Sequence, residues 1–162
     1  MRKKINIALV AHDARKHELI EWCKFNSQSL ALHNLYATGT TAKLISDVEY
    51  IVREHYEHGF VDSERKLEVT PLLSGPLGGD QQIGAMIAEG KIDVLIFFCD
   101  NLITQGHQQD VGALVRLASL YNIAFATNRT TADMLMTSSL IDSLEYERII
   151  PAAINNYKNR TL

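Results

Sequence analysis

The segment 73–82, LSGPLGGDQQ, holds the residues of this chain best suited to chemistry: three glycines, a serine and one carboxylate. Glycines let the backbone approach a ligand closely, and the amides that open a following helix attract an anion such as a phosphate. The carboxylate of Asp80 repels phosphate. It therefore serves either as the N-cap of that helix or as a base that takes a proton beside a bound phosphoester. On this segment alone the cap is the commoner role.

Polar residues follow other apolar runs in the same way. Lys16 lies one helical turn after His12 and offers a positive charge for a phosphate. Thr38 to Thr41, with Gly39 between hydroxyls, is a second candidate anion-binding turn, although on this stretch alone a threonine-capped helix with a turn glycine is the favoured interpretation. The polar segments are His12-Asp13, Thr38 to Thr41, Ser74 to Asp80, Asp100, and Thr127-Asn128.

His107 and Asp110 stand three residues apart at an expected helix start. In such a pair the carboxylate orients the imidazole for proton transfer. A helix cap beside a surface histidine is the commoner meaning of this spacing, so the pair is a weak signal by itself.

The order of apolar patterns indicates how these residues are positioned. Short, continuous apolar runs are typical of strands covered on both faces, and helical spacing follows each run. A short strand or edge is expected at 149–150, Asp13 is a candidate N-cap, and Pro151 opens a terminal helix. Strands are expected at 5–11, 32–37, 69–73, 93–99 and 123–126, with helices at 14–28, 42–48, 81–89, 111–120 and 130–140.

Alternation of strand and helix predicts an α/β fold, a single three-layer domain with a parallel sheet of about five strands flanked by helices. In such open sheets, ligands bind outside the carboxyl ends of the strands. All the polar segments follow strands, so they are expected to meet at one edge. Independent N-caps do not explain a histidine, paired threonines and three glycines together. Their coincidence favours Asp80 as a base.

Composition excludes several classes of function. With 162 residues, 46% of them hydrophobic, and a net charge of −3, the chain is expected to form one domain. It has no electrostatic signature for nucleic acid or an anionic membrane. Its two cysteines form no CxxC pattern, which favours a reducing, cytoplasmic setting. Neither a leader pattern nor an apolar run of membrane-spanning length is found.

The segment 47–68 is rich in charges of both signs and interrupts the alternation of elements. It is expected to be a charged insertion that forms a helix extension followed by a loop or hairpin. His55 and His58, beside Glu54, have the spacing of metal ligands, but without a clear third ligand a solvated surface is the better interpretation.

These motifs together resemble the methylglyoxal synthase family. The resemblance covers nearly the whole chain, and the Gly-Gly-Asp-Gln-Gln of the central loop is highly specific. It rests on His12-Asp13 with Lys16, on 36–41 (YATGTT), on 73–82, and on 90–98 (GKIDVLIFF).

The resemblance implies a cytoplasmic lyase, covering 1–162 as one domain, that converts dihydroxyacetone phosphate to methylglyoxal and inorganic phosphate. It implies a homohexamer and neither metal nor organic cofactor. The net charge and the short apolar runs separately predict no nucleic-acid or membrane partner. Phosphate is expected to inhibit, because product and substrate share one site.

The resemblance also implies roles for individual residues. Asp80 would take the C3 proton, and His107, supported by Asp110, would polarise the carbonyl or protonate the enediolate oxygen. Asp13 and Asp100 would shape the charge and proton network, and Arg160 would reach a neighbouring subunit's phosphate site. Substrate and phosphate would be held by His12, Lys16, Thr38, Gly39, Thr40, Thr41, Ser74, Gly75 and His107.

The chain departs from the family pattern near His107. Gly106 replaces a usual proline, Gln108-Gln109 replace Asp-Pro, and Cys99 replaces a usual aromatic residue. Gly106 loosens the loop that carries His107, which bears on the rate more than on the reaction. The alternative is a sensor of phosphorylated metabolites that keeps the binding loops and has lost turnover. The retained carboxylates oppose it, because negative charge near phosphate gives a sensor no advantage.

Overall fold

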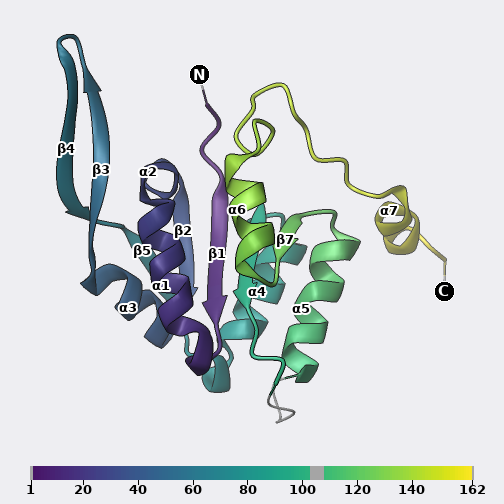
Figure 1. Ribbon diagram of the computed structural model, residues 1–162. Coiled ribbons are helices and arrows are strands. Elements are labelled where there is room, and N and C mark those ends of the chain that lie inside the picture. The colour runs from purple at the N-terminus through teal and green to yellow at the C-terminus, as the bar shows by residue number, and fades with distance from the viewer. Residues whose placement is uncertain (1, 103–107, 162) are drawn as a thin grey trace.

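A computed structural model describes residues 2–102 and 108–161. Its centre is a five-stranded sheet in the order β5-β2-β1-β6-β7, and every neighbouring pair is parallel. The expected α/β fold is therefore confirmed (Figure 1). The strands are β1 (Asn6–Ala11), β2 (Asn34–Thr38), β5 (Val69–Leu72), β6 (Val94–Phe98) and β7 (Ala124–Ala126).

Helices cover both faces of the sheet because side chains alternate across each strand. On β1, Ile7 and Leu9 pack into the core under α1, α2, α3 and α6, whereas Ala8 and Val10 pack under α4 and α5. The two cores make the domain three layers thick. The helices are η1 (Asp13–Arg15), α1 (Lys16–Phe25), α2 (Ser27–Leu30), α3 (Gly39–Asp47), η2 (Gly75–Leu77), α4 (Gly79–Ala88), α5 (Gln108–Leu120), α6 (Arg129–Thr137) and α7 (Ala152–Lys158).

Several expected boundaries were wrong. The helix expected at 14–28 is divided into η1, α1 and α2, and the break falls at Asn26, whose side-chain amide donates to the Trp22 carbonyl. Asp13 is not the N-cap of α1, because it lies inside η1 and Arg15 holds the cap position. Residues 149–150 form no strand, although Pro151 does precede a terminal helix.

Two helices begin earlier than expected because glycine permits unusually close packing. α3 begins at Gly39 and α4 at Gly79. A Cβ at Gly39 would lie 3.1 Å from the Ser74 nitrogen, and one at Gly79 would lie 2.0 Å from the Leu73 carbonyl oxygen. Each glycine therefore lets a helix start directly against the neighbouring loop.

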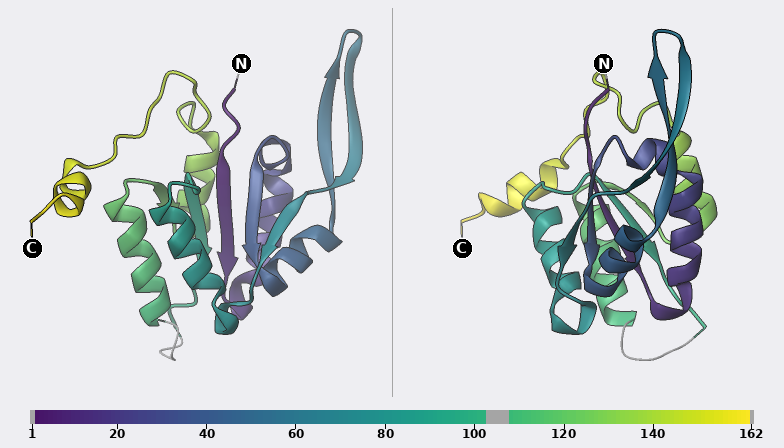
Figure 2. Two further views of the ribbon diagram at one scale, coloured as in Figure 1. Left: turned by 180° about the vertical axis from the view of Figure 1, so that it is seen from behind. Right: turned by 90° about the vertical axis from the view of Figure 1, so that its left-hand side faces the viewer.

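The charged segment forms an antiparallel hairpin, so the hairpin alternative is correct and the helix extension is not. β3 (Glu49–Tyr56) pairs along its full length with β4 (Gly59–Lys66). The root of the hairpin is held by buried Tyr50, whose hydroxyl donates to the Ile45 carbonyl at 2.9 Å. Its tip projects away from the sheet (Figure 2).

Candidate active site

The loops at the carboxyl ends of β1, β2, β5 and β6 converge at one edge of the sheet, the lower end in Figure 1. Backbone hydrogen bonds tie them together: the His12 amide donates to the Phe98 carbonyl at 3.1 Å, and the Gly39 amide to the Leu73 carbonyl at 3.3 Å. This edge is where ligands bind in open parallel sheets. The structure thus brings His12, Asp13, Thr38 to Thr40, Ser74, Gly75, Asp80 and Asp100 together on these loops and on the first turns of the helices that follow them.

Asp80 is the second residue of α4 and not its N-cap, so the cap role considered for it is not observed. The cap position belongs to Gly78, whose φ of 105° suits glycine. Asp80 is only 9% exposed, and its Oδ2 lies 3.7 Å from the point that a Cβ on Gly75 would occupy. Its carboxylate is therefore turned toward the glycine-rich loop, at a helix N-terminus that favours negative charge.

Lys16 links the segment that follows β1 to the segment that follows β2. Its Nζ donates to Asp13 Oδ1 at 2.6 Å and to Thr40 Oγ1 at 2.7 Å, and its side chain is 17% exposed. The ammonium thus stands beside the first turn of α3. Thr38 holds the N-cap position there, but its hydroxyl makes no capping bond, so the threonine-cap alternative is not observed. A cation next to helical amides is suited to bind a phosphate.

His12 and Asp100 meet through backbone and ring atoms. The Asp100 amide donates to His12 Nδ1 at 2.8 Å. The His12 ring also packs edge-on against Phe97, with centroids 5.2 Å apart. Both contacts fix the direction of the imidazole at the end of β1.

A groove of about 330 Å³ between α4 and α5 brings two predicted carboxylates to one cavity. Asp80 and Asp110 both line it, together with small and apolar side chains that include Gly84 and Leu117. His107 and Gly106 lie outside the described residues. Asp110 lies in the first turn of α5, so its predicted partnership with His107 stays a prediction.

Three other predicted positions lie apart from these groups. Thr41 is 1% exposed, and its hydroxyl has no hydrogen-bond partner among the described residues. Asn128 caps α6 by accepting from the Thr131 amide at 2.9 Å. Arg160 stacks on Tyr157 at 3.4 Å, beyond α7, which stands away from the carboxyl edge within this chain (Figure 2).

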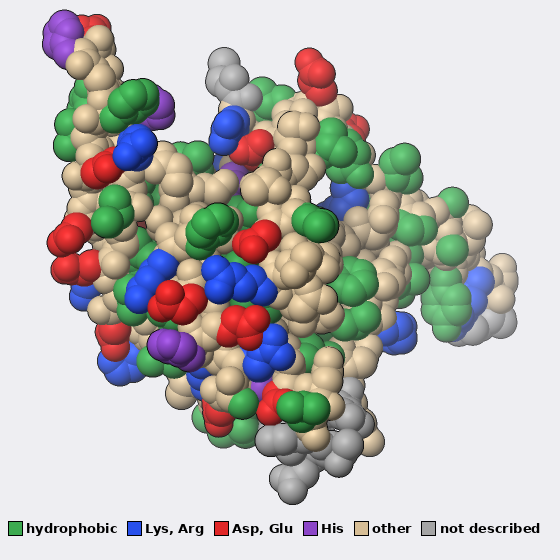
Figure 3. Space-filling model, in the orientation of Figure 1, with side chains coloured by type: hydrophobic (Ala, Val, Ile, Leu, Met, Phe, Trp, Pro, Cys, Tyr) green, Lys and Arg blue, Asp and Glu red, His purple; other side chains and the backbone are tan. Residues whose placement is uncertain are grey.

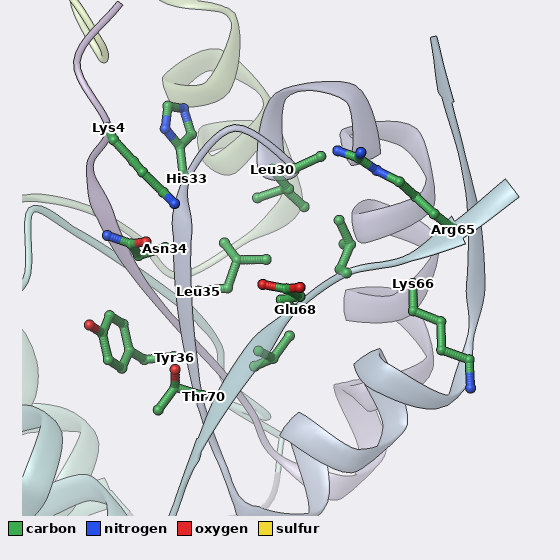
Figure 4. A pocket seen from close by; sticks show the side chains of 13 residues that line it. Lys4, Leu30, His33, Asn34, Leu35, Tyr36, Arg65, Lys66, Glu68 and Thr70 are labelled. Atoms are coloured by element: carbon green, nitrogen blue, oxygen red, sulfur yellow. The ribbon is translucent and has the colours of Figure 1, made fainter. Parts of the chain in front are cut away.

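A second cavity, of about 550 Å³, lies at the opposite, amino ends of β2 and β5 (Figure 4). Lys4 and Arg65 stand on either side of Glu68 there, and His33 lies beside Lys4. Burial lowers the pKa of His33, and neither ring nitrogen has a hydrogen-bond partner within the described residues. None of the predicted site residues lines this cavity. No sequence motif pointed to it.

Two side chains that support the site escaped the sequence analysis. Gln82 accepts a hydrogen bond from the Leu73 amide at 2.8 Å and so ties α4 to the glycine-rich loop. Arg15 donates to the Cys99 carbonyl at 3.2 Å and so joins η1 to the end of β6. Both act on backbone groups across the fold. Only the Gln-Gln after Asp80 in the family motif pointed to either of them.

The metal alternative gains no support from the hairpin. His55 packs edge-on against Phe60 at 4.6 Å, and among residues 2–102 and 108–161 no group of three or more histidine, cysteine or acidic side chains is arranged to hold an ion. On the surface over α1, acidic and basic side chains are intermixed, without an extended basic area on the face seen in Figure 3. No helix in the described part of the chain is long and apolar enough to cross a membrane.

The two thiols are expected to resist alkylation in the folded protein. Burial raises the pKa of Cys99 to about 11 and that of Cys23 to about 12, and the thiolate is the reactive form. At pH 8 we therefore expect negligible iodoacetamide labelling over the time in which a free thiol reacts fully, and rapid labelling of both cysteines in denaturant. Fast labelling of the native protein would contradict this arrangement, most directly for Cys99, which adjoins Asp100.

Comparison with known proteins identifies the family to which this fold belongs. The chain contains an MGS-like domain, because the family model for that domain matches residues 18–127. The chain belongs to the methylglyoxal synthase family. It is 54% identical to the methylglyoxal synthase of Proteus mirabilis over 135 residues, covering 83% of this chain and 78% of that protein.

Two further relatives extend the similarity over almost the full length. The methylglyoxal synthase of Maridesulfovibrio salexigens is 50% identical over 148 residues, which is 91% of this chain and 92% of that one. A crystal structure of methylglyoxal synthase from Elizabethkingia anophelis superposes with a TM-score of 0.79 at 39% identity, covering 98% of this chain and 93% of that one. Family and fold are therefore shared over most of the chain.

Proposed function

We propose that this chain is a cytoplasmic carbon-oxygen lyase that converts dihydroxyacetone phosphate to methylglyoxal and inorganic phosphate. One observation carries the proposal: the buried Asp80 carboxylate faces a glycine-rich loop on the sheet edge where Lys16 also lies, hydrogen-bonded to Thr40 in the first turn of α3. A base and an anion site on one edge are what the reaction requires. Kinship with methylglyoxal synthases supports the same substrate.

In the proposed mechanism Asp80 takes the proton from C3. The electrons of the C3–H bond form a C2=C3 double bond, and negative charge moves to the C2 oxygen. After the C2 oxygen is protonated, the C3 hydroxyl loses its proton and becomes the C3=O aldehyde, the C2=C3 double bond shifts to C1=C2, and the C1–O bond breaks to release phosphate. The remaining enol takes up a proton at C1 and becomes methylglyoxal. We assign His107 to polarise the C2 carbonyl, with Asp110 as its partner.

Phosphate is assigned to the amides and hydroxyls at the start of α3, to Ser74 and Gly75, and to Lys16. Their arrangement matters because phosphate leaves only when the C1–O bond is perpendicular to the enediolate plane, where that bond overlaps the π system. An isomerase acting on the same intermediate has to hold that bond in the plane. The angle at which the loops hold phosphate therefore decides the product, and His12, Asp13 and Asp100 complete the polar surroundings.

The proposal is tested by incubating the purified protein with dihydroxyacetone phosphate. Methylglyoxal and phosphate release are followed together, at low and high added phosphate. Equal release of both, suppressed by added phosphate, is expected. Absence of release, with phosphate still raising the thermal unfolding midpoint, would favour the sensor alternative. Sedimentation velocity on the same sample tests the proposed homohexamer, in which Arg160 would reach a neighbouring phosphate site.

Lys16→Met is expected to weaken phosphate binding more than it slows chemistry. A hydrogen bond to a charged group contributes about 1.5–3 kcal/mol, so KM for substrate and the inhibition constant for phosphate should both rise about 10- to 100-fold. Lys43→Met is the matched control, because Lys43 pairs with Asp47 on the exposed side of α3. A fall in kcat with KM unchanged would remove Lys16 from the phosphate site.

A further inference from the structure

The peptide group that links Cys99 to Asp100 is held at both of its polar ends. Its N–H, that of Asp100, donates to His12 Nδ1 at 2.8 Å. Its carbonyl oxygen, that of Cys99, accepts from Arg15 Nη1 at 3.2 Å. Two residues that follow β1 thus hydrogen-bond to one peptide group that follows β6. These bonds fix the backbone that carries the Asp100 side chain.

Arg15 is itself held in place. Its Nε donates to Glu18 Oε2 at 2.6 Å, and both side chains are about one-third exposed. The hydrogen bond to Glu18 is the main cause that raises the pKa of Arg15, and the nearby charge of Asp100 acts in the same direction. The guanidinium is therefore permanently charged, and Glu18 directs its remaining N–H groups toward the Cys99 carbonyl.

The hydrogen bond from this peptide determines which ring nitrogen of His12 carries the proton. A backbone N–H can only donate, so His12 Nδ1 must carry a lone pair, and the proton of the neutral ring must be on Nε2. Protonation of Nδ1 requires the peptide to give up its bond to the ring. As long as Arg15 holds the carbonyl end, the peptide cannot turn to offer that oxygen to an imidazolium.

We propose that Arg15, supported by Glu18, is a positioning residue: it holds the Cys99–Asp100 peptide so that His12 presents only its neutral Nε2–H tautomer and Asp100 keeps a fixed direction. Neither Arg15 nor Glu18 is assigned to contact substrate. The inference rests on the proposed function only in taking His12 and Asp100 as part of the active site. Asp13 and Lys16 are charged residues of the same loop as His12 and pair with each other, and Arg15 and Asp100 are the charged residues at the peptide that His12 contacts.

The test is long-range ¹H–¹⁵N NMR of the imidazole groups at pH 7.5, with the His12 signals assigned by their loss in His12→Asn. The parent protein should show only the Nε2–H tautomer. Arg15→Gln should show a mixture in which Nδ1 is partly protonated. It should also lower kcat about tenfold, the effect of losing one charge-assisted hydrogen bond, with KM changed less than twofold. Arg15→Lys should restore part of kcat.

The matched control is Lys24→Gln, which removes another i,i+3 ion pair on α1, that of Lys24 with Glu21, without touching the peptide. It should leave both the His12 signals and kcat unchanged. Glu18→Gln is a second variant, expected to shift the tautomer less than Arg15→Gln, and it serves if Arg15→Gln does not fold. Parent-like His12 signals in Arg15→Gln, or in Glu18→Gln when only that variant folds, would overturn the proposal.

The readouts also separate this inference from the proposed function. If the parent protein releases no methylglyoxal while Arg15→Gln still changes the His12 tautomer, positioning stands and the lyase assignment fails. If the parent is active and Arg15→Gln keeps both its kcat and its single tautomer, the lyase assignment stands and the positioning role fails.

Discussion

Asp80→Asn is expected to lower kcat for methylglyoxal formation by about 10²- to 10⁴-fold, the usual contribution of a positioned base. An amide has nearly the shape of a carboxylate but cannot take a proton from C3. The fold should persist, because Asp80 is not the cap of α4, and the lost charge at a helix N-terminus costs only about 0.3–1 kcal/mol. Substrate should bind as well or better, since a negative charge near phosphate is removed.

Two measurements together check the role of Asp80. Exchange of C3 hydrogen with solvent deuterium reports proton abstraction directly, and phosphate inhibition reports the integrity of the binding loops. Asp47→Asn is the control, because Asp47 pairs with Lys43 on an exposed part of α3. Retention of exchange in Asp80→Asn would show that another group is the base. Loss of folding would return Asp80 to a structural role.

The position of the site could be predicted from the sequence because it follows from topology. Apolar runs predicted the strands, and parallel order placed their carboxyl ends together. His12, Ser74 and Asp100 each lie within two residues of the end of a strand. The same reasoning failed within a few residues of each loop. α3 and α4 begin at Gly39 and Gly79, where close packing against another loop overrides the weak helix propensity of glycine.

Other features could not be predicted because they depend on contacts between distant segments. The hydrogen bond from Arg15 to the Cys99 carbonyl joins residues 84 positions apart in the chain, and no local pattern encodes it. Thr41 shared a motif with Thr40, yet only Thr40 contacts Lys16, while Thr41 turns into the core. The cavity beside Lys4 and Arg65 arises where the hairpin returns to the sheet, and its existence depends on tertiary packing alone.

Gly79→Ala is expected to lower both the free energy of unfolding and kcat/KM. The expected loss of stability is opposite to the gain that alanine usually gives over glycine in a helix. In a helix, alanine is intrinsically favoured over glycine by about 1 kcal/mol, and Gly79 does not have positive φ. Yet a Cβ there would lie 2.0 Å from the Leu73 carbonyl oxygen and 3.0 Å from Thr38 Cγ2. The first is a backbone atom, so α4 and the glycine-rich loop have to move apart. Such overpacking typically costs about 1–3 kcal/mol or more.

The same displacement should reduce kcat/KM by about 10²-fold, the effect of misplacing a reacting group by about 1 Å, because Asp80 is the next residue of α4. Urea unfolding and steady-state kinetics measure the two effects. Gly112→Ala in α5 is the control: a Cβ there meets nothing within 4 Å, so that variant should gain up to about 1 kcal/mol and keep its activity. If Gly79→Ala is likewise more stable and active, the contact with Leu73 does not constrain the loop, and the position of Asp80 needs another cause.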